Sequence, residues 1–230
     1  MIDAYQTANA SLPLVLLVAI AWRWLHRAAI AGGALGLGIA VKFFLWPLIV
    51  WLLATRRLLA AGIAVTTAAA SLLLMVPFTD IGEYVRLLQK LRRTFEPDSY
   101  TIFALLNDLG TPATLARAVT VAAGLVVLAL AWRRQSLTLA IAATLVLSPI
   151  AWRHFFVLLI VPLALACPRL DPLWFLPLGM WIGDGTFNGA PWQTAGVLAL
   201  AAATIVACEL RPRPRDVGAC HSREPASLPI

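Results

Sequence analysis

Apolar runs follow one another along almost the whole chain, and short clusters of arginine separate them. The runs cover 12–25, 28–41, 43–55, 59–78, 115–132, 137–147, 155–166, 172–183 and 192–208. They bring the hydrophobic content to 61% and leave 13% of the residues charged, which is more apolar side chain than a soluble protein of 230 residues needs. We therefore expect an integral membrane protein with an all-α fold, a polytopic transmembrane helical bundle.

Some of these runs are too short to cross a membrane alone, because one crossing requires about 20 residues. The short runs come in two pairs. Each pair flanks a polar interruption: 28–41 and 43–55 flank Lys42, and 137–147 and 155–166 flank the apex that contains Arg153 and His154. Each pair is either one overlong helix or two short helices that form a hairpin around a polar apex.

The positions of the arginines favour hairpins, because short cytoplasmic loops of membrane proteins collect Lys and Arg. With two hairpins, one side of the membrane holds 11 Lys and Arg against 4 acidic residues, and the other side holds 7 against 7. A single crossing over 28–55 would move Arg56, Arg57, Arg133 and Arg134 to the opposite side and weaken this asymmetry. The hairpin arrangement places Lys42 and the Arg153–His154 pair together on the extracytoplasmic side.

The largest extracytoplasmic segment is the loop 79–114. Its apolar residues recur every three or four positions, which predicts an amphipathic helix lying in the membrane interface. These residues are Ile81, Tyr84, Val85, Leu88 and Leu91. A second short helix is expected over 102–109. We assign 1–208 to one transmembrane domain and 209–230, which is rich in Arg and Pro, to a disordered cytoplasmic tail.

Lys42 interrupts the first pair of apolar runs, and a lysine at the centre of the hydrocarbon costs roughly 2.5–3.5 kcal/mol. Its ammonium either caps the hairpin and reaches water or lipid headgroups, or it binds an anionic group such as a phosphate. The sequence supports both of these interpretations of Lys42.

Arg153 and His154 interrupt the second pair directly after Ser148 and Pro149, which break helical geometry. Arginine can bind a phosphate through two parallel hydrogen bonds, and an adjacent imidazole can donate, accept or carry a proton. Irregular backbone at membrane depth is tolerated where it is buried in protein or lines a wet cavity. The alternative is a hairpin tip that is anchored among the lipid headgroups, with Trp152 as an interfacial residue.

The cysteines, the net charge and the remaining polar and aromatic residues do not indicate a specific site. Cys167, Cys208 and Cys220 lack metal-ligand spacing, and the sequence contains no nucleotide-binding glycine loop, so we expect neither metal nor cofactor. The net charge of +7 lies in clusters that flank the membrane, which argues against nucleic acid as a partner. Four further candidates have ordinary explanations as interfacial or loop residues: Trp174, Trp181, Trp192 and Asp184. Glu96 and Asp98, beside Tyr100, either form a turn or reach a polar substrate held at the membrane surface.

Two segments resemble a known family. "AIAGGALGLGIAVKFFLWPLIVWLLATRR" resembles the part of glycosyltransferase family 87, the polyprenyl-phosphate-mannose-dependent mannosyltransferases, in which a helix of small residues leads to a lysine, an apolar run and an arginine pair. "LSPIAWRHFFVLLIVPLAL" is similar to the Ser-Pro-x-Ser-Trp-x-His stretch of the same family. The order of the elements also agrees, and the resemblance covers nearly the whole chain before the tail.

The resemblance implies a C-type glycosyltransferase fold in the bacterial inner membrane, with an active site on the extracytoplasmic side. Such enzymes transfer a hexose, often mannose, from a polyprenyl-phosphate sugar donor to a glycan or glycolipid acceptor. The carrier phosphate is the leaving group. Lys42, Arg153 and His154 are then expected to bind the substrate at this phosphate, where cations stabilise the developing charge.

The chain also departs from the family pattern. Ala151 stands where members often have Ser, Phe155 stands where they often have a second His, and 99–101 differ at the start of the second loop helix. The carboxylate expected to act as general base belongs to an external loop nearer the N-terminus of longer members, so we assign no catalytic residue and expect the C-terminal portion of such an enzyme. The alternative is a non-enzymatic or inactive membrane protein that binds a lipid carrier. A transporter is less favoured, because no inverted repeat is evident.

Overall fold

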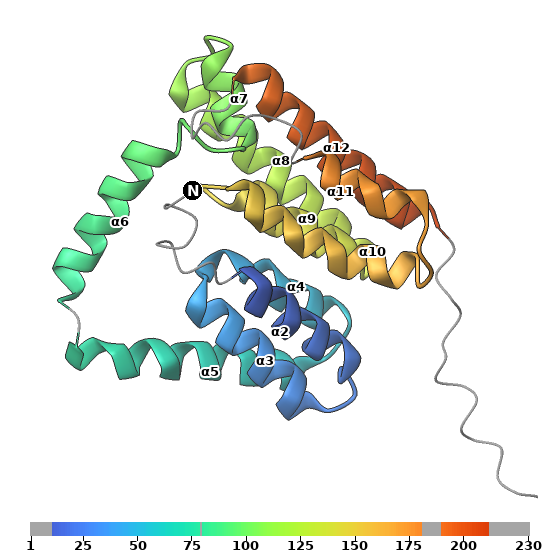
Figure 1. The fold of residues 1–230 in the computed structure, drawn as a ribbon. Coiled ribbons are helices and arrows are strands. Elements are labelled where there is room, and N and C mark those ends of the chain that lie inside the picture. The colour runs from blue at the N-terminus through green and yellow to red at the C-terminus, as the bar shows by residue number, and fades with distance from the viewer. Residues whose placement is uncertain (1–10, 79, 181–189, 212–230) are drawn as a thin grey trace, which may run out of the picture.

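The computed structural model describes residues 11–78, 80–180 and 190–211, and within these ranges all regular elements are helices (Figure 1). The all-α fold expected from the sequence is confirmed, and the helices follow the predicted apolar runs closely. The elements are α2 (Ser11–Arg23), α3 (Ala28–Val41), η1 (Phe43–Leu45), α4 (Pro47–Ala54), α5 (Leu58–Met75), η2 (Val76–Phe78), α6 (Ile81–Phe95), α7 (Ile102–Asp108), α8 (Ala113–Arg134), α9 (Leu137–Leu147), η3 (Arg153–Leu159), α10 (Ile160–Ala166), η4 (Pro172–Phe175), α11 (Leu176–Gly179) and α12 (Pro191–Leu210).

Within the described ranges, three helices are long and apolar enough to cross a membrane. They are Leu58–Phe78, which combines α5 and η2, Ala113–Arg134 and Pro191–Leu210. Apolar side chains on α5 such as Leu59, Leu73 and Leu74 are exposed, as expected of a surface that faces lipid. The chain is therefore a helical, multi-pass membrane protein.

Helices α3 and α5 pack closely, and they run in the same direction. A Cβ atom added to Gly32 would lie 2.5 Å from the carbonyl oxygen of Ala60. A Cβ atom added to Gly36 would lie 2.6 Å from the carbonyl oxygen of Ala64. Moving four residues forward along α3 therefore moves the contact four residues forward along α5, so the two helices are parallel. The small residues let their backbones approach closely. Because α3 and α5 are parallel, the chain must return between them, and α4 makes that return.

The return begins at Lys42. This residue ends α3 with an extended backbone, φ −144° and ψ 102°, and its N–H still donates to the carbonyl oxygen of Gly38 at 2.9 Å. Pro47 opens α4, where its missing N–H is not needed. The first hairpin predicted from the sequence is therefore present, with Lys42 at its apex.

Helices α9 and α10 form the second reversal, through the irregular segment 148–152. Ser136, directly before α9, donates a hydrogen bond to Glu209 near the end of α12. Arg211, directly after α12, donates to the sulfur of Cys167, which directly follows α10. The start of α9 and the end of α10 therefore both meet the end of α12, which makes α9 and α10 antiparallel.

The two reversals gather the basic clusters at one end of the bundle. Arg56 and Arg133 line one pocket there, and Arg211 forms an ion pair with Asp171 at 2.9 Å. This is the grouping that the positive-inside argument predicts; the assignment of this end to the cytoplasm stays a prediction. Helix α12 continues to Leu210, past the predicted start of the tail at 209, and residues 212–230 lie outside the described part of the chain.

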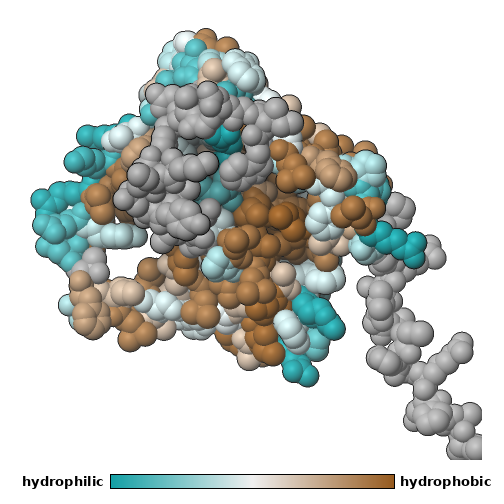
Figure 2. Space-filling model, in the orientation of Figure 1, coloured by the Kyte–Doolittle hydropathy of each residue, from teal (hydrophilic) through white to brown (hydrophobic). Residues whose placement is uncertain are grey.

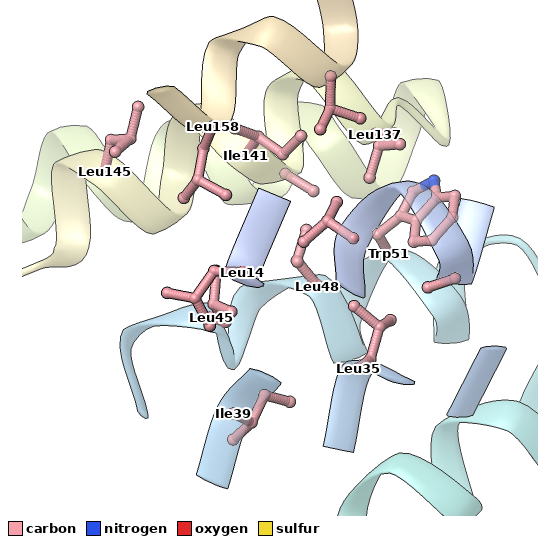
Figure 3. Close-up of a cluster of buried hydrophobic side chains, with 14 of the residues drawn as sticks. Leu14, Leu35, Ile39, Leu45, Leu48, Trp51, Leu137, Ile141, Leu145 and Leu158 are labelled. Carbon is pink, nitrogen blue, oxygen red and sulfur yellow. The ribbon is translucent and has the colours of Figure 1, made fainter. Parts of the chain in front are cut away.

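A common apolar core joins the two hairpins (Figure 3). It draws side chains from α2, α3, η1, α4, α9 and η3: Leu14, Leu35, Ile39, Leu45, Leu48, Trp51, Leu137, Ile141, Leu145 and Leu158. Leu48 of α4 and Ile141 of α9 are fully buried. Packing of α4 beside α9 fixes the distance between the Lys42 apex and the 148–154 segment.

Helix α6 stands apart from the bundle, between α5 and α7 (Figure 1). None of its residues is buried, and polar side chains gather along it in Figure 2, whereas apolar side chains cover much of the face over α2–α5. Asp80 caps its first turn by accepting a hydrogen bond from the N–H of Glu83 at 3.0 Å. The amphipathic helix predicted here is confirmed, and its position in the membrane interface stays a prediction.

Glu96 anchors the far end of α6 to the bundle. Its buried carboxylate accepts hydrogen bonds from Arg92 at 3.3 Å and from Arg117 of α8 at 2.8 Å. The guanidinium of Arg117 also lies over the ring of Phe103 in α7, 5.0 Å from its centroid. The acidic residue that the sequence left as a turn residue or a substrate contact thus connects α6, α7 and α8.

Replacing Glu96 with alanine should loosen α6 and α7 without unfolding the bundle. Both arginine partners are about half exposed, so we expect a loss of about 1–2 kcal/mol confined to this region. Amide hydrogen exchange in α6 and α7 should become faster in Glu96→Ala. Glu83→Ala, which removes an exposed carboxylate in the first turn of α6, is the control; equal exchange in both variants would contradict the anchoring role.

Candidate functional site

Phe155 lies at the centre of the contacts between the two apices. Its ring stacks on that of Phe44, with centroids 4.9 Å apart and an interplanar angle of 10°. The Nζ atom of Lys42 lies 3.8 Å from the centroid of the Phe155 ring, and the His154 ring approaches it edge-on at 4.7 Å. Lys42 from the first hairpin and His154 from the second therefore share one aromatic platform.

Local sequence explains how the second apex presents these side chains. Ser148 ends α9, and its hydroxyl donates to the carbonyl oxygen of Ile150 at 2.6 Å, which stabilises the turn at Pro149. The chain resumes as the 3₁₀ helix η3 at Arg153. With three residues per turn, neighbouring side chains point about 120° apart, so Arg153 and His154 face different directions.

Arg153 faces the loop that follows α6. Its guanidinium carbon lies 5.3 Å from the centroid of the Tyr100 ring, and the N–H of Tyr100 donates to the carbonyl oxygen of Ala151 at 2.8 Å. These contacts connect the segment that follows α6 directly to the second apex.

A pocket of about 320 Å³ lies beside Arg153. Tyr100, Trp192 and Gln193 contribute polar or aromatic lining, and Met180 with nearby residues of α12 contributes an apolar wall. The sequence did not predict this pocket, because its walls come from the segment between α6 and α7, from η3, and from residues in and around α11 and α12. Trp192 was expected to be an interfacial residue; in the structure it is largely exposed and forms one edge of the pocket.

The charge at the apex is cationic. In the part of the chain that the structure describes, no carboxylate forms an ion pair with Lys42. One acidic group of the loop is engaged elsewhere, because Glu96 binds two arginines. Burial together with the nearby charge of Asp98 raises the pKa of Asp108 above its ordinary value, which makes its charged form less favourable. An uncompensated, half-buried cation is suited to bind an anion.

The other candidates lie away from this site or outside the described ranges. Trp174 is at the opposite end of the bundle, where its Nε1 donates to the carbonyl oxygens of Cys167 at 3.1 Å and Arg169 at 3.2 Å. Trp181 and Asp184 fall outside the described residues. Among the residues that are described, no three His, Cys, Asp or Glu side chains gather as metal ligands.

Comparisons with known proteins agree with the motif resemblance. The family model of Glycosyltransferase family 87 matches residues 1–162, which include both hairpin apices. Helices α11 and α12, and with them one wall of the pocket beside Arg153, lie beyond the matched residues, so the family likeness is shorter than the motifs suggested. Neither the curated proteins nor the solved structures gave a match. The chain is thus a helical membrane protein that belongs to glycosyltransferase family 87.

Proposed function

We propose that this chain transfers a hexose, such as mannose, from a polyprenyl-phosphate donor on the extracytoplasmic side of the bacterial inner membrane. Lys42 and His154 bind the carrier phosphate beside Phe155, and Arg153, which faces the adjacent pocket, binds the donor where the phosphate meets the sugar. The observation that carries the proposal is the contact of Lys42 and His154 with one aromatic ring, Phe155, although the two residues come from separate hairpins.

The chemistry requires stabilisation of the departing phosphate. As the bond between the sugar and the carrier phosphate breaks, negative charge builds up on the phosphate oxygens, and fixed cations lower the energy of that state. Lys42 supplies a point charge, Arg153 supplies a planar pair of donors, and His154 supplies an imidazole N–H. The partial burial of Lys42 strengthens this attraction, because less water screens it.

The pocket beside Arg153 is the proposed place for a sugar. Its volume of about 320 Å³ is at the small end of ligand pockets, which fits one sugar unit better than a whole glycolipid. The largely exposed ring of Trp192 offers an apolar face to a sugar ring, and Arg153, which lies over the buried ring of Tyr100, connects the pocket to the phosphate site. The acceptor is a glycan or glycolipid that approaches from the same side, and membrane lipid surrounds the bundle.

The second candidate is a membrane protein that binds a lipid carrier and transfers nothing. One observation favours it: within the described residues, no carboxylate forms an ion pair with Lys42 or His154, so no acidic group is seen beside them to act as a base. Carrier binding without transfer would distinguish it from the enzyme.

The test uses membranes that contain the full chain and a radiolabelled polyprenyl-phosphate mannose. Transfer of label to a glycan or lipid fraction is expected, and Lys42→Met or His154→Ala should reduce it at least about a hundredfold, as loss of a positioned charge in an active site does. Lys90→Met, on exposed α6, removes the same charge away from the site and should leave transfer unchanged. Retained donor binding with no transfer by any preparation would favour the carrier-binding alternative.

A further inference from the structure

The end of the bundle opposite Lys42 carries an unusual pair of residues. In the described part of the chain, Arg56 and Gln135 are the residues other than glycine with positive φ, at 58° and 50°. Each follows a helix, Arg56 after α4 and Gln135 after α8. Both line the same pocket, of about 480 Å³, although 78 residues lie between them in the sequence.

The two turns are built in the same way. In the first, the N–H groups of Arg56 and Arg57 donate to the carbonyl oxygens of Leu53 and Leu52. In the second, those of Gln135 and Ser136 donate to the carbonyl oxygens of Trp132 and Ala131. This hydrogen-bonding pattern ends many helices, and glycine is the usual residue at its left-handed position. A large side chain there is held in an unfavourable backbone conformation, and such outliers gather at functional sites.

The pocket offers donors for an anion. Arg56 and Arg133 supply guanidinium groups from two different turns, Gln135 supplies an amide, and half-exposed Trp132 supplies an aromatic edge. Within the described residues, neither arginine forms an ion pair. The acidic groups known at this end are already bound: Glu209 accepts from Ser136, and Asp171 pairs with Arg211.

We propose that this pocket binds the phosphate group of an anionic lipid headgroup at the membrane surface opposite the Lys42 apex. Two guanidinium groups can each form paired hydrogen bonds to phosphate oxygens, and tryptophan beside them suits the depth of the headgroups. The bound phosphate joins the α4–α5 turn to the α8–α9 turn. The inference does not depend on the proposed transfer reaction, because the pocket lies at the other ends of α4 and α9.

The test measures the thermal unfolding midpoint of the purified full chain in neutral detergent. Phosphatidylglycerol should raise the midpoint in a saturable way, and phosphatidylcholine should not, because binding to the folded state stabilises it. Arg133→Ala should weaken the apparent affinity for phosphatidylglycerol about tenfold, which corresponds to one charge-assisted hydrogen bond. Arg134→Ala, which removes an equal charge one residue further along and outside the pocket lining, should keep the wild-type affinity.

Arg56→Gly separates binding from folding. Glycine fits the left-handed turn better than arginine, so this variant should unfold in the absence of lipid at the wild-type midpoint or above it. Its apparent affinity for phosphatidylglycerol should nevertheless fall about tenfold, as in Arg133→Ala, and an unchanged affinity would contradict the proposal. No response of the wild type, or equal losses in Arg133→Ala and Arg134→Ala, would overturn the proposal. If inorganic phosphate alone stabilised the protein equally, the pocket would bind a free ion and the proposal of a lipid headgroup would be wrong.

Discussion

Gly36→Ala should destabilise the bundle strongly, although it adds a single methyl group. The added Cβ atom would lie 2.6 Å from the carbonyl oxygen of Ala64 and 2.6 Å from the Cβ atom of Thr67. Neither atom can move without shifting α5. We expect a loss of about 3 kcal/mol, at the upper end of the effect of overpacking a core, and more in the double variant with Gly32→Ala. Thermal unfolding in detergent measures the loss.

Gly33→Ala is the matched control for this prediction. Gly33 lies in the same helix, and a Cβ atom added there meets nothing within 4 Å. Gly62→Ala is the corresponding control in α5, for the same reason. Both controls should unfold near the wild-type midpoint. If Gly36→Ala matched them, α3 and α5 could not be packed in the parallel register described here.

Phe155→Leu should reduce hexose transfer by about tenfold or more while the chain still folds. Leucine fills much of the buried volume, but it removes the ring that stacks on Phe44 and holds the Lys42 ammonium. The stacking is worth about 0.5–1.5 kcal/mol, and the cation–π contact about 0.5–2 kcal/mol. Together these contacts hold Lys42 in place, so their loss should lower the rate at which membranes that contain the variant transfer labelled hexose.

Phe156→Leu separates positioning from packing. Phe156 is the next residue in η3 and is also buried, and the aromatic and cationic contacts found around Phe155 do not include it. Both leucine variants lose a buried ring, so both should lower the unfolding midpoint by similar amounts. Only Phe155→Leu should slow transfer at temperatures where both are folded. Equal slowing would show that general packing, and not the Phe155 platform, controls the rate.

The helices were predictable because the signals that define them are local. Apolar runs beside arginine clusters or polar interruptions predicted α3, α4, α8 and α9, and the spacing of apolar residues over 81–91 predicted α6. Lys42 and His154 stood out for the same reason, since a charge inside an apolar run is unfavourable wherever the run lies in the fold. These features need only a window of about 20 residues.

The contacts that position the site were not predictable in this way. Glu96 meets Arg117, 21 residues away, and looked like an ordinary turn residue beside Pro97. Tyr100 and Gln193 belong to segments with no shared pattern, yet they line one pocket with Arg153. The left-handed backbone at Arg56 gave no signal either, because its side chain is not the type that usually marks such turns.

The sequence by itself determined that this chain is a helical membrane protein with two polar apices and basic clusters between its apolar runs. It did so because long apolar runs in hydrocarbon satisfy their backbone polar groups by forming helices, and because each charge there is unfavourable. Only the tertiary structure decided that Lys42 and His154 share the Phe155 ring, and that Arg56 and Gln135 share a pocket at the other end. Both juxtapositions depend on the packing of α4 beside α9, which is set by complementary side-chain shapes between distant segments and not by the pattern of either segment alone.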